Sequence, residues 1–396
     1  MKKLILFFLT ITLLSFNAFS QWTQKADFGG VPRFGAVGFS IGNKAYIGTG
    51  DDGNYCLKDF WEYDPANDAW VQKTDFGGSP RMYAVAFSIG NKGYVGTGYD
   101  GISYFKDFWE YDPSIDSWSQ IADFGGDGRY SAVAFSINNK GYVGTGTSSS
   151  NNYLQDFWAY DPFSNIWTQK TDLGGGGRSY AVGFSIQQNA KGYIGTGTPG
   201  YNDFWEYDAL SDNWTQKPNF LGSPRYGALG FSIESKGYLG TGWDGTLSNK
   251  DFMEFDPSSN IWIIKTDLPD SGRVYGVGFS IGSKGYIGTG RYRGTKKCDD
   301  IYLKDFWEYN PLNDGIADVT DNSEIKIFPN PTTNDITIVF PEKATIEILN
   351  INGQIIKTIY NNDKETTIDL RSLSSGVYII KAKTDEGMTI KKFVKQ

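Results

Sequence analysis

Residues 92–98, KGYVGTG, followed by residues 107–113, DFWEYDP, and then by Trp118 form the unit that decides the fold. This unit recurs six times along the chain, and an arginine precedes each copy. The Gly-Thr-Gly elements begin at Gly48, Gly96, Gly144, Gly195, Gly240 and Gly288, and the arginines are Arg33, Arg81, Arg129, Arg178, Arg225 and Arg273. Successive arginines are 48, 48, 49, 47 and 48 residues apart. A repeat of this length without helical periodicity predicts a β-propeller or a related array of sheets.

Each repeat predicts four short strands. In the second repeat they cover residues 81–89, 93–98 and 108–111 and the surroundings of Trp118. Gly and Pro interrupt the joins between them. Along the first strand, small residues such as Ala84 and Ala86 share one face, and Val85 and Phe87 share the other. We therefore expect the first strands to converge on an axis, with the larger face filling the gap to the next blade.

The repeat resembles the kelch motif. The resemblance is carried by Gly-Tyr-Val-Gly-Thr-Gly, Asp-Phe-Trp-Glu-Tyr-Asp-Pro and the tryptophan that follows, with Gly-Thr-Gly where that family usually has Gly-Gly. It covers about residues 22–312 and holds in all six copies. It implies an all-β fold, a six-bladed propeller of four-stranded blades around a channel.

The ends of the repeat region predict how the ring closes. Five units are followed by their own fourth-strand tryptophan, but the sixth, residues 273–311, has none. A spare copy of that strand stands at the other end of the region, as residues 22–25, WTQK. We expect this N-terminal strand to complete the last blade within residues 21–312, which removes an exposed sheet edge.

The repeated tryptophans and arginines have a structural interpretation. Eleven of the twelve tryptophans occupy repeat positions, and each can bury a large apolar area in a blade core. The six arginines recur without exception, which favours ion pairs with the repeated aspartates. The alternative is that the repeated arginines and aspartates belong to repeated copies of a functional site.

Composition excludes several functional classes. The 396 residues carry a net charge of −8 with no strongly basic run, which argues against nucleic-acid binding. The chain has no histidine, so it has no Ser-His-Asp triad and no His-containing zinc or copper site. We predict no cofactor and no metal site.

Residues 1–20 have the pattern of a secretory signal peptide. Lys2 and Lys3 form a charged start, an apolar run follows, and Ala18-Phe19-Ser20 is a small-x-small cleavage site. A membrane anchor is the alternative, but the run is short for a bilayer span. Removal of the two lysines takes the net charge of the mature chain from −8 to −10. We expect no transmembrane segment in the mature chain.

Residues 313–323 form a polar linker, and residues 324–396 predict seven short strands of a small Ig-like sandwich. This module resembles the type IX secretion C-terminal sorting domain. The matching residues are Phe328-Pro329-Asn330-Pro331, Asn352-Gly353-Gln354, Leu370, Leu373, Gly376-Val377-Tyr378 and Lys391-Lys392-Phe393-Val394-Lys395. The resemblance implies passage through the outer membrane by the type IX machinery, to the cell surface or the medium. An ordinary adhesive sandwich is the alternative.

The loops between second and third strands differ among the repeats and carry the candidate ligand-binding residues. Such loops on a rigid scaffold commonly hold binding residues, and aromatic and charged side chains suit a glycan or a protein ligand. The candidates are Trp243, Asp244, Tyr99, Asp100, Tyr201, Arg291 and Arg293. We expect Trp243 to be the main anchor, because it is the one tryptophan outside the repeat positions. The alternative is that these aromatic residues only cap the blade edges.

We therefore predict a secreted or surface-displayed binding module for glycan or protein ligands, and not an enzyme. The alternative function is a carbohydrate-active enzyme such as a sugar mutarotase or epimerase, because anomerisation needs only positioned acid and base groups. No unique carboxylate pair stands out in the sequence. Copper chemistry of the galactose-oxidase kind needs histidine ligands that the chain lacks.

Cys56 and Cys298 are the two cysteines of the chain, 242 residues apart. They lie in equivalent loops of the first and sixth repeats, which become neighbours when a six-bladed ring closes. The exported compartment permits disulfides. We expect a Cys56–Cys298 bridge across the seam, with two free thiols or a metal pair as the alternative.

Overall fold

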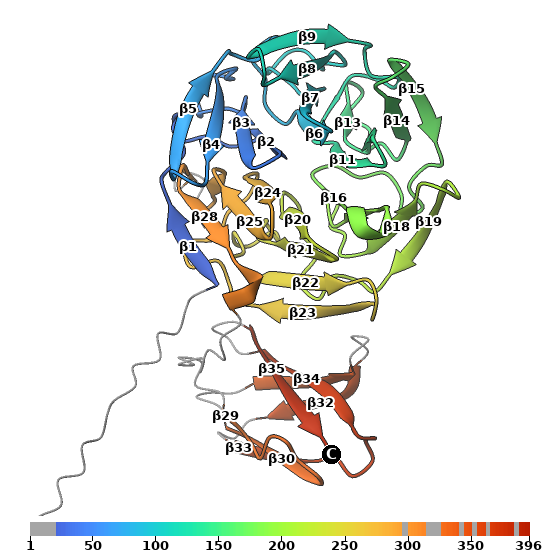
Figure 1. Ribbon diagram of the computed structural model, residues 1–396. Helices are drawn as coiled ribbons and strands as arrows, with labels where there is room; N and C mark the ends of the chain where they lie inside the picture. Colours follow the sequence, from blue (N-terminus) through green and yellow to red (C-terminus); the bar gives the residue numbers. More distant parts are fainter. Residues whose placement is uncertain are drawn as a thin grey trace, which may run out of the picture.

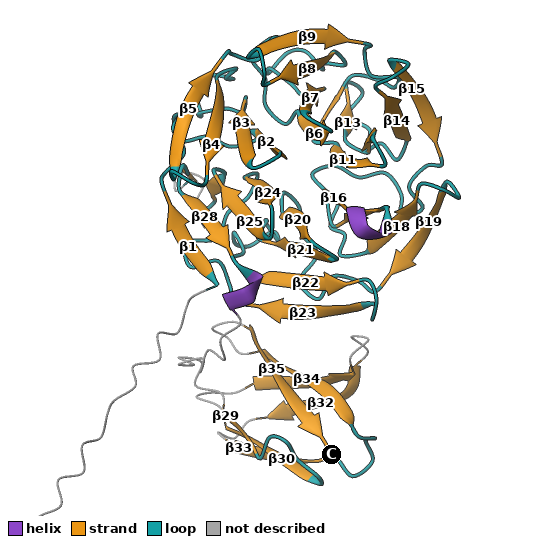
Figure 2. Ribbon diagram, in the orientation of Figure 1, coloured by secondary structure: helices purple, strands orange, loops and turns teal. Residues whose placement is uncertain are grey.

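The structure, a computed structural model, describes residues 21–294, 300–313, 326–339, 344–350, 355–361, 365–383 and 388–396. The expected signal peptide at residues 1–20 and residues 314–323 of the expected linker lie outside these ranges. Cys298 lies outside them as well. In the described part, short β-strands dominate and are joined by turns and two short 3₁₀ helices (Figure 2).

Six four-stranded antiparallel sheets form the blades of a closed ring (Figure 1). In the first five blades the strands follow chain order from the innermost strand outward. The strands of the first three blades are β2 (Val37–Ile41), β3 (Lys44–Gly48), β4 (Phe60–Asp64) and β5 (Ala69–Lys73); β6 (Val85–Ile89), β7 (Lys92–Gly96), β8 (Phe108–Asp112) and β9 (Ser117–Ile121); and β11 (Val133–Ile137), β12 (Lys140–Gly144), β14 (Phe157–Asp161) and β15 (Ile166–Lys170).

The remaining blades repeat this arrangement, and two short strand pairs lie in the loops. The strands are β16 (Val182–Ile186), β17 (Lys191–Gly195), β18 (Phe204–Asp208) and β19 (Asn213–Lys217); β20 (Leu229–Ile233), β21 (Lys236–Gly240), β22 (Phe252–Asp256) and β23 (Ile261–Lys265); and β24 (Val277–Ile281), β25 (Lys284–Gly288), β28 (Phe306–Tyr309) and β1 (Trp22–Lys25). The loop pairs are β10 (Arg129–Tyr130) with β13 (Thr147–Ser148) and β26 (Arg291–Tyr292) with β27 (Ile301–Tyr302), and the 3₁₀ helices are η1 (Gln187–Asn189) and η2 (Pro311–Asn313).

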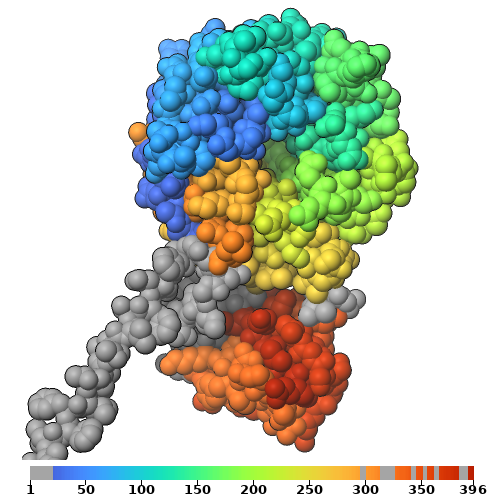
Figure 3. Space-filling view, in the orientation of Figure 1, coloured from blue at the N-terminus to red at the C-terminus, as the bar shows by residue number. Residues whose placement is uncertain are grey.

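The N-terminal strand closes the ring, as the sequence predicts. β1 pairs antiparallel with β28, and Trp22 lies opposite Tyr309. Blue and orange segments, from opposite ends of the propeller sequence, accordingly lie side by side in the ring (Figures 1 and 3). Trp22 is only 3% exposed, and its indole N–H donates to the Thr266 carbonyl at 2.9 Å. The last blade is therefore built from both ends of the repeat region.

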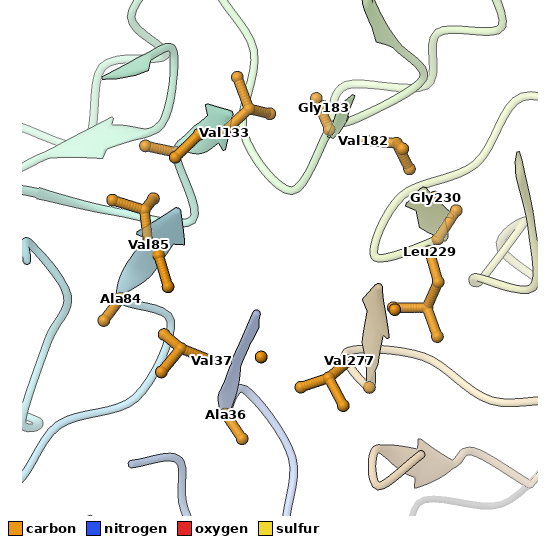
Figure 4. A pocket seen from close by; sticks show the side chains of 18 residues that line it. Ala36, Val37, Ala84, Val85, Val133, Val182, Gly183, Leu229, Gly230 and Val277 are labelled. Carbon is orange, nitrogen blue, oxygen red and sulfur yellow. The ribbon is translucent and has the colours of Figure 1, made fainter. Parts of the chain in front are cut away.

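The blades pack small faces against large ones around the axis. Along β2, Val37, Phe39 and Ile41 are buried and the intervening residues are half-buried. A Cβ atom added to Gly38 would lie 2.8 Å from Cβ of Val277 in the sixth blade, so this position must stay small. The innermost strands of all six blades surround a channel of about 180 Å³ (Figure 4). This confirms the expected alternation of small and large residues on the first strands.

Each repeated arginine is fully or almost fully buried and pairs with the aspartate that opens the third strand of its own blade. In the first blade, Nη1 and Nη2 of Arg33 donate to the two carboxylate oxygens of Asp59 at 2.6 and 2.7 Å. Nη1 also donates to the carbonyl of Thr49 at 2.9 Å, and the indole of Trp61 donates to Asp59 at 2.8 Å. The same pairing joins Arg81–Asp107, Arg129–Asp156, Arg178–Asp203, Arg225–Asp251 and Arg273–Asp305. The expected structural role of these arginines is confirmed.

Two opposing effects set the charge of Asp59, Asp107 and Asp156. Burial by itself raises the pKa of Asp59, because it disfavours the carboxylate. The hydrogen bonds and positive charge of Arg33 outweigh that effect and hold the pKa below its usual value. Asp107 and Asp156 have a lowered pKa for the same reasons. The carboxyl groups of Asp59, Asp107 and Asp156 are therefore ionised in the folded protein at neutral pH.

Backbone groups of the same arginines tie each blade to the one before it. The N–H of Arg81 donates to the carbonyl of Leu57 at 3.1 Å, and its carbonyl accepts from Gly50 at 2.8 Å. Equivalent glycine-to-arginine bonds of 2.7–2.8 Å run round the ring, and Gly290 to Arg33 is the link that closes it. At the outer circumference, each fourth-strand tryptophan donates to a carbonyl of the preceding blade at 2.9–3.2 Å.

The C-terminal module is a separate two-sheet sandwich. One sheet contains β29 (Lys326–Phe328), β30 (Asp335–Val339) and β33 (Glu365–Asp369), and the other has the order β32 (Ile355–Asn361), β31 (Ala344–Asn350), β34 (Gly376–Lys383), β35 (Met388–Lys395). Its core includes Ile336, Ile348, Ile368, Tyr378 and Phe393. The described residues contain the seven strands that the sequence predicts, because apolar and polar residues alternate along each of them.

Replacing Trp22 with alanine tests the closure of the ring. We expect the Trp22→Ala variant to lose about 3–5 kcal/mol of unfolding free energy, since the substitution empties a buried site and removes the bond to Thr266. Chemical denaturation of the wild type and the variant measures this loss. Phe163→Ala is the control, because Phe163 is 100% exposed. Equal stability of Trp22→Ala and the wild type would show that β1 does not hold the last blade.

Candidate functional site

The candidate site lies at one end of the propeller, which we call the loop face. It is the end at which the second strand of each blade finishes and the third begins. The loops that form it are residues 49–59, 97–107, 145–156, 196–203 and 241–251 and the described parts of 289–305. The segments that carry the repeated arginines cross the same end, between successive blades.

Six aromatic side chains gather where the arginine segments meet at the centre of this face. In the first, third and fifth blades the aromatic residue directly follows the arginine, and in the other blades it stands two residues after the arginine. We call these six residues the aromatic rosette. It consists of Phe34, Tyr130 and Tyr226 as the outer members, and Tyr83, Tyr180 and Tyr275 as the inner members.

The inner tyrosines contact one another, and each outer ring lies between two of them. Ring centroids are 5.1 Å apart for Tyr83–Tyr180 and Tyr83–Tyr275, and 4.9 Å apart for Tyr180–Tyr275. Tyr130 lies 6.0 Å from both Tyr83 and Tyr180. Phe34 and Tyr226 likewise each contact two inner tyrosines. The rosette therefore has approximate threefold symmetry on a sixfold scaffold.

Space near the axis explains this alternation. The residues two after the arginine converge on the axis, and blades one, three and five place Gly35, Ser131 and Gly227 there. A Cβ atom on Gly35 would lie 2.9 Å from Cδ1 of Tyr83, and one on Gly227 would lie 2.7 Å from Cδ1 of Tyr275. Three large and three small residues can share this space, and six tyrosines could not.

A closed circle of backbone hydrogen bonds lies beneath the rosette. Tyr83 donates its N–H to the carbonyl of Gly35, Ser131 donates to Tyr83, and the sequence of bonds returns from Gly35 to Tyr275. The six bonds are 2.8–3.0 Å long. All six residues have φ between 53° and 63°, which is the left-handed conformation. Tyrosine in this conformation is uncommon, and the circle of bonds holds it there.

The inner tyrosines partly close the channel at its mouth. They line a cavity of about 130 Å³ together with the small residues at the equivalent positions. Burial raises the pKa of Tyr83, Tyr180 and Tyr275 well above the usual tyrosine value. Their hydroxyls therefore stay protonated and can act as hydrogen-bond donors or acceptors at neutral pH.

Two arginines of the sixth-blade loop extend over the edge of the rosette. The guanidinium of Arg291 lies 5.0 Å from the ring centroid of Phe34 and 5.5 Å from that of Tyr275, and it pairs with Asp300 at 3.3 Å. Arg293 lies 4.7 Å from the Trp243 ring, and its Nη1 donates to the Tyr226 hydroxyl at 3.3 Å. Sequence reasoning selected both arginines, and the structure brings them to the rosette.

The remaining candidates divide between turns and ring contacts. Asp100 and Asp244 accept backbone N–H bonds within their own loops, so each carboxylate stabilises a turn. The Tyr201 ring stacks on the buried guanidinium of Arg178 at 4.2 Å, which gives it a structural contact. The ring centroid of Tyr99 lies 5.4 Å from that of Tyr130, so Tyr99 extends the aromatic surface on the side of the second blade.

Trp243 has a different position from the one expected of an exposed anchor. It is only 9% exposed, and its backbone exchanges two hydrogen bonds with Tyr226. Arg293 lies over its ring. The Trp243 side chain therefore packs against Arg293, and its backbone holds Tyr226. We revise the role of Trp243 from ligand anchor to support for these two residues.

The thiol of Cys56 lies against Asp51 at 3.5 Å and the Tyr99 carbonyl at 3.8 Å, on the side of the second blade. Burial, with the nearby Asp51 carboxylate, raises the pKa of this thiol to about 12. The first-blade loop does contact the sixth blade, because Gly53 packs against the ring of Tyr302. Cys56 has no disulfide partner among the described residues, and the bridge to Cys298 stays a prediction.

Comparison with known families identifies the C-terminal module. Residues 326–396 match the family described as the secretion system C-terminal sorting domain. The chain is therefore a type IX export substrate, delivered to the cell surface or secreted. In the part of the chain that the structure describes, no helix has the length and apolar character to span a bilayer. The expected export route is confirmed.

Comparison with solved structures supports the propeller. Among them, 435 chains match, and one of these is the structure of YjhT. The YjhT chain is 19% identical, with a TM-score of 0.60, and the match covers 71% of this chain and 95% of the other. At this identity the likeness shows the fold alone, and it agrees with the expected six-bladed kelch-type propeller. The search of curated proteins gives no match.

Truncation of Trp243 tests its revised role. We expect Trp243→Ala to cost about 3–5 kcal/mol of unfolding free energy, because a buried indole leaves a cavity. The control is Tyr55→Ala, which removes a 75% exposed aromatic residue from the same face. Denaturation curves for both variants provide the measurement. A Trp243→Ala protein as stable as the control would contradict this supporting role and favour the expected role of Trp243 as a ligand anchor.

Proposed function

We propose that the protein is an exported binding module that holds a glycan ligand on the aromatic rosette of its propeller. The observation that carries the proposal is the rosette with Arg291 and Arg293 at its edge. Aromatic side chains converge there from all six blades, phenol hydroxyls come from five of them, and the two guanidinium groups come from the sixth-blade loop. The sorting domain places this surface outside the cell, where glycans of surfaces and of the surrounding medium are accessible.

The chemistry of the rosette supports a sugar ligand. A pyranose ring presents an apolar face that stacks on an aromatic ring, and hydroxyls at its edge that need donors and acceptors. Each tyrosine offers an aromatic ring for stacking and a hydroxyl for hydrogen bonding. Burial keeps the hydroxyls of Tyr180 and Tyr275 protonated, so they can donate as well as accept. The closed circle of backbone bonds fixes the backbone of the inner tyrosines before a ligand arrives, which lowers the conformational entropy lost on binding.

A protein ligand is the alternative to a glycan if the protein is a binding module. Peptides often bind by adding a strand to a sheet edge. Around the centre of the loop face the backbone groups already bond to one another, in the closed circle and between Tyr226 and Trp243. This favours a ligand recognised by side chains, and so favours the glycan.

A carbohydrate-active enzyme, such as a mutarotase or epimerase, remains the runner-up. It would need acid and base groups beside the bound sugar. Of the loop carboxylates, Asp100 and Asp244 hold turns and Asp300 pairs with Arg291. No observation on the described residues singles out one of them as an acid or base.

A glycan array with the purified exported chain tests the proposal. We expect binding to a subset of glycans and a loss of affinity on the order of ten-fold for Tyr130→Ala, which removes one stacking ring. Phe163→Ala is the matched control, because it removes an exposed aromatic residue at the opposite end of β14 in the same blade.

For each glycan that binds, NMR then measures the rate at which its two anomers exchange in the presence of the wild type and of each variant. Accelerated exchange that Tyr130→Ala abolishes would favour the enzyme. Binding confined to proteins, or glycan binding that Tyr130→Ala and Phe163→Ala leave equally intact, would contradict the proposed site.

A further inference from the structure

One arginine of the chain differs from all the others in its partners. The chain contains nine arginines, and eight of them pair with an aspartate: the six repeated ones, Arg291 with Asp300, and Arg371 with Asp369. Arg293 has no carboxylate partner among the described residues. It stands at the edge of the rosette, in a chain whose net charge is −8.

Arg293 is nevertheless held in place. Its backbone N–H donates to Oγ of Ser248 at 2.9 Å, which ties its loop to the fifth blade. Its guanidinium lies over Trp243 in a cation–π contact, with 4.7 Å to the ring centroid. Nη1 reaches the Tyr226 hydroxyl at 3.3 Å. The charge is therefore positioned by the buried indole below it and by a member of the rosette beside it.

Within the part of the chain that the structure describes, most donors of this guanidinium have no acceptor. A guanidinium carries five N–H donors in a planar fork. Among the described residues, the side-chain bond of Arg293 is the one to Tyr226. A fixed, half-buried cation with free donors attracts an anion, and the guanidinium geometry matches a carboxylate in a bidentate arrangement.

We propose that Arg293 is the carboxylate-binding subsite of the rosette, and that the ligand is an acidic glycan of the uronic-acid class. The inference rests on the proposed glycan-binding function and names its ligand class. The sugar ring stacks on the rosette and its carboxylate accepts from the Arg293 fork. An acidic peptide would offer the same charge, but the backbone groups near Tyr226 that a peptide would use are already paired.

Paired oligosaccharides test this subsite. The probes are oligomers of galacturonate, glucuronate and mannuronate, each with its carboxyl-reduced neutral counterpart, titrated into the full exported chain by calorimetry. We expect the wild type to bind at least one acidic oligomer roughly ten-fold or more tightly than its neutral counterpart. That preference should weaken as salt is added, because an exposed ion pair is screened.

Arg293→Gln should bind the acidic and neutral oligomers equally, with the affinity that the wild type has for the neutral one. Arg293→Lys should recover part of the preference, since it restores the charge without the fork. Arg371→Gln is the control, because it removes an arginine that is 70% exposed in the C-terminal module. Melting temperatures of all variants separate a binding loss from unfolding.

The outcomes distinguish this inference from the function on which it rests. A wild type that binds only neutral glycans, or an acidic preference that survives in folded Arg293→Gln, overturns the subsite and leaves the glycan-binding function standing. A wild type that binds acidic peptides and no oligosaccharide overturns the glycan class. A preference that disappears in Arg293→Gln and persists in Arg371→Gln supports the subsite.

Discussion

The bidentate bond between a buried arginine and an aspartate, made once in every blade, is the interaction on which this structure depends. The side chain of Arg33 joins the entry to the innermost strand with Asp59 at the start of the third strand, and with the Thr49 carbonyl between them. The backbone of the same residue reaches the neighbouring blade. One residue type thus holds the inside of a blade together and fixes its angle to the next. Because a buried guanidinium without its carboxylate is very unfavourable, arrangements that separate the two partners are disfavoured.

Closing such a ring has a consequence at its centre. Six chain segments arrive at one axis after the arginines, and their backbones bond in a circle that leaves room for three large side chains. The tyrosines of alternate blades occupy that room, and the aromatic residues of the other blades lie outside them. The proposed binding surface is therefore a product of the packing that closes the fold. Strain in the left-handed tyrosines is compensated by the circle of bonds. The sorting domain adds the remaining element of the function, which is delivery of this rigid surface to the outside of the cell.

Much of this architecture could be predicted from sequence, because six copies of one unit report the same packing requirement. The blade strands, the spare strand at Trp22 and the arginine–aspartate pairs all follow from comparing one repeat with the next. The candidate site is harder to predict, because differences between loops do not show which of their side chains are buried. Trp243 is buried, and whether an isolated aromatic residue is exposed depends on contacts such as the one with Arg293. The rosette had a visible signal, the alternation of Phe34, Tyr130 and Tyr226 with Tyr83, Tyr180 and Tyr275 at adjacent positions. That signal is weak in any one pair of repeats, because the aromatic residue shifts by one position between neighbouring repeats.

A double-mutant cycle on Arg129 and Asp156 tests most directly whether the buried pairs hold the ring together. The unfolding free energies of the wild type, Arg129→Leu, Asp156→Leu and the double variant would be measured by chemical denaturation. Asp156→Leu leaves the buried Arg129 guanidinium without a carboxylate, and Arg129→Leu leaves the half-buried Asp156 carboxylate without its cation, so we expect each to cost about 3–5 kcal/mol. The double variant leaves no such charge, so its loss should fall well short of the sum of the two. Losses that add within about 0.5 kcal/mol would show that the pair is not coupled, and would contradict the account.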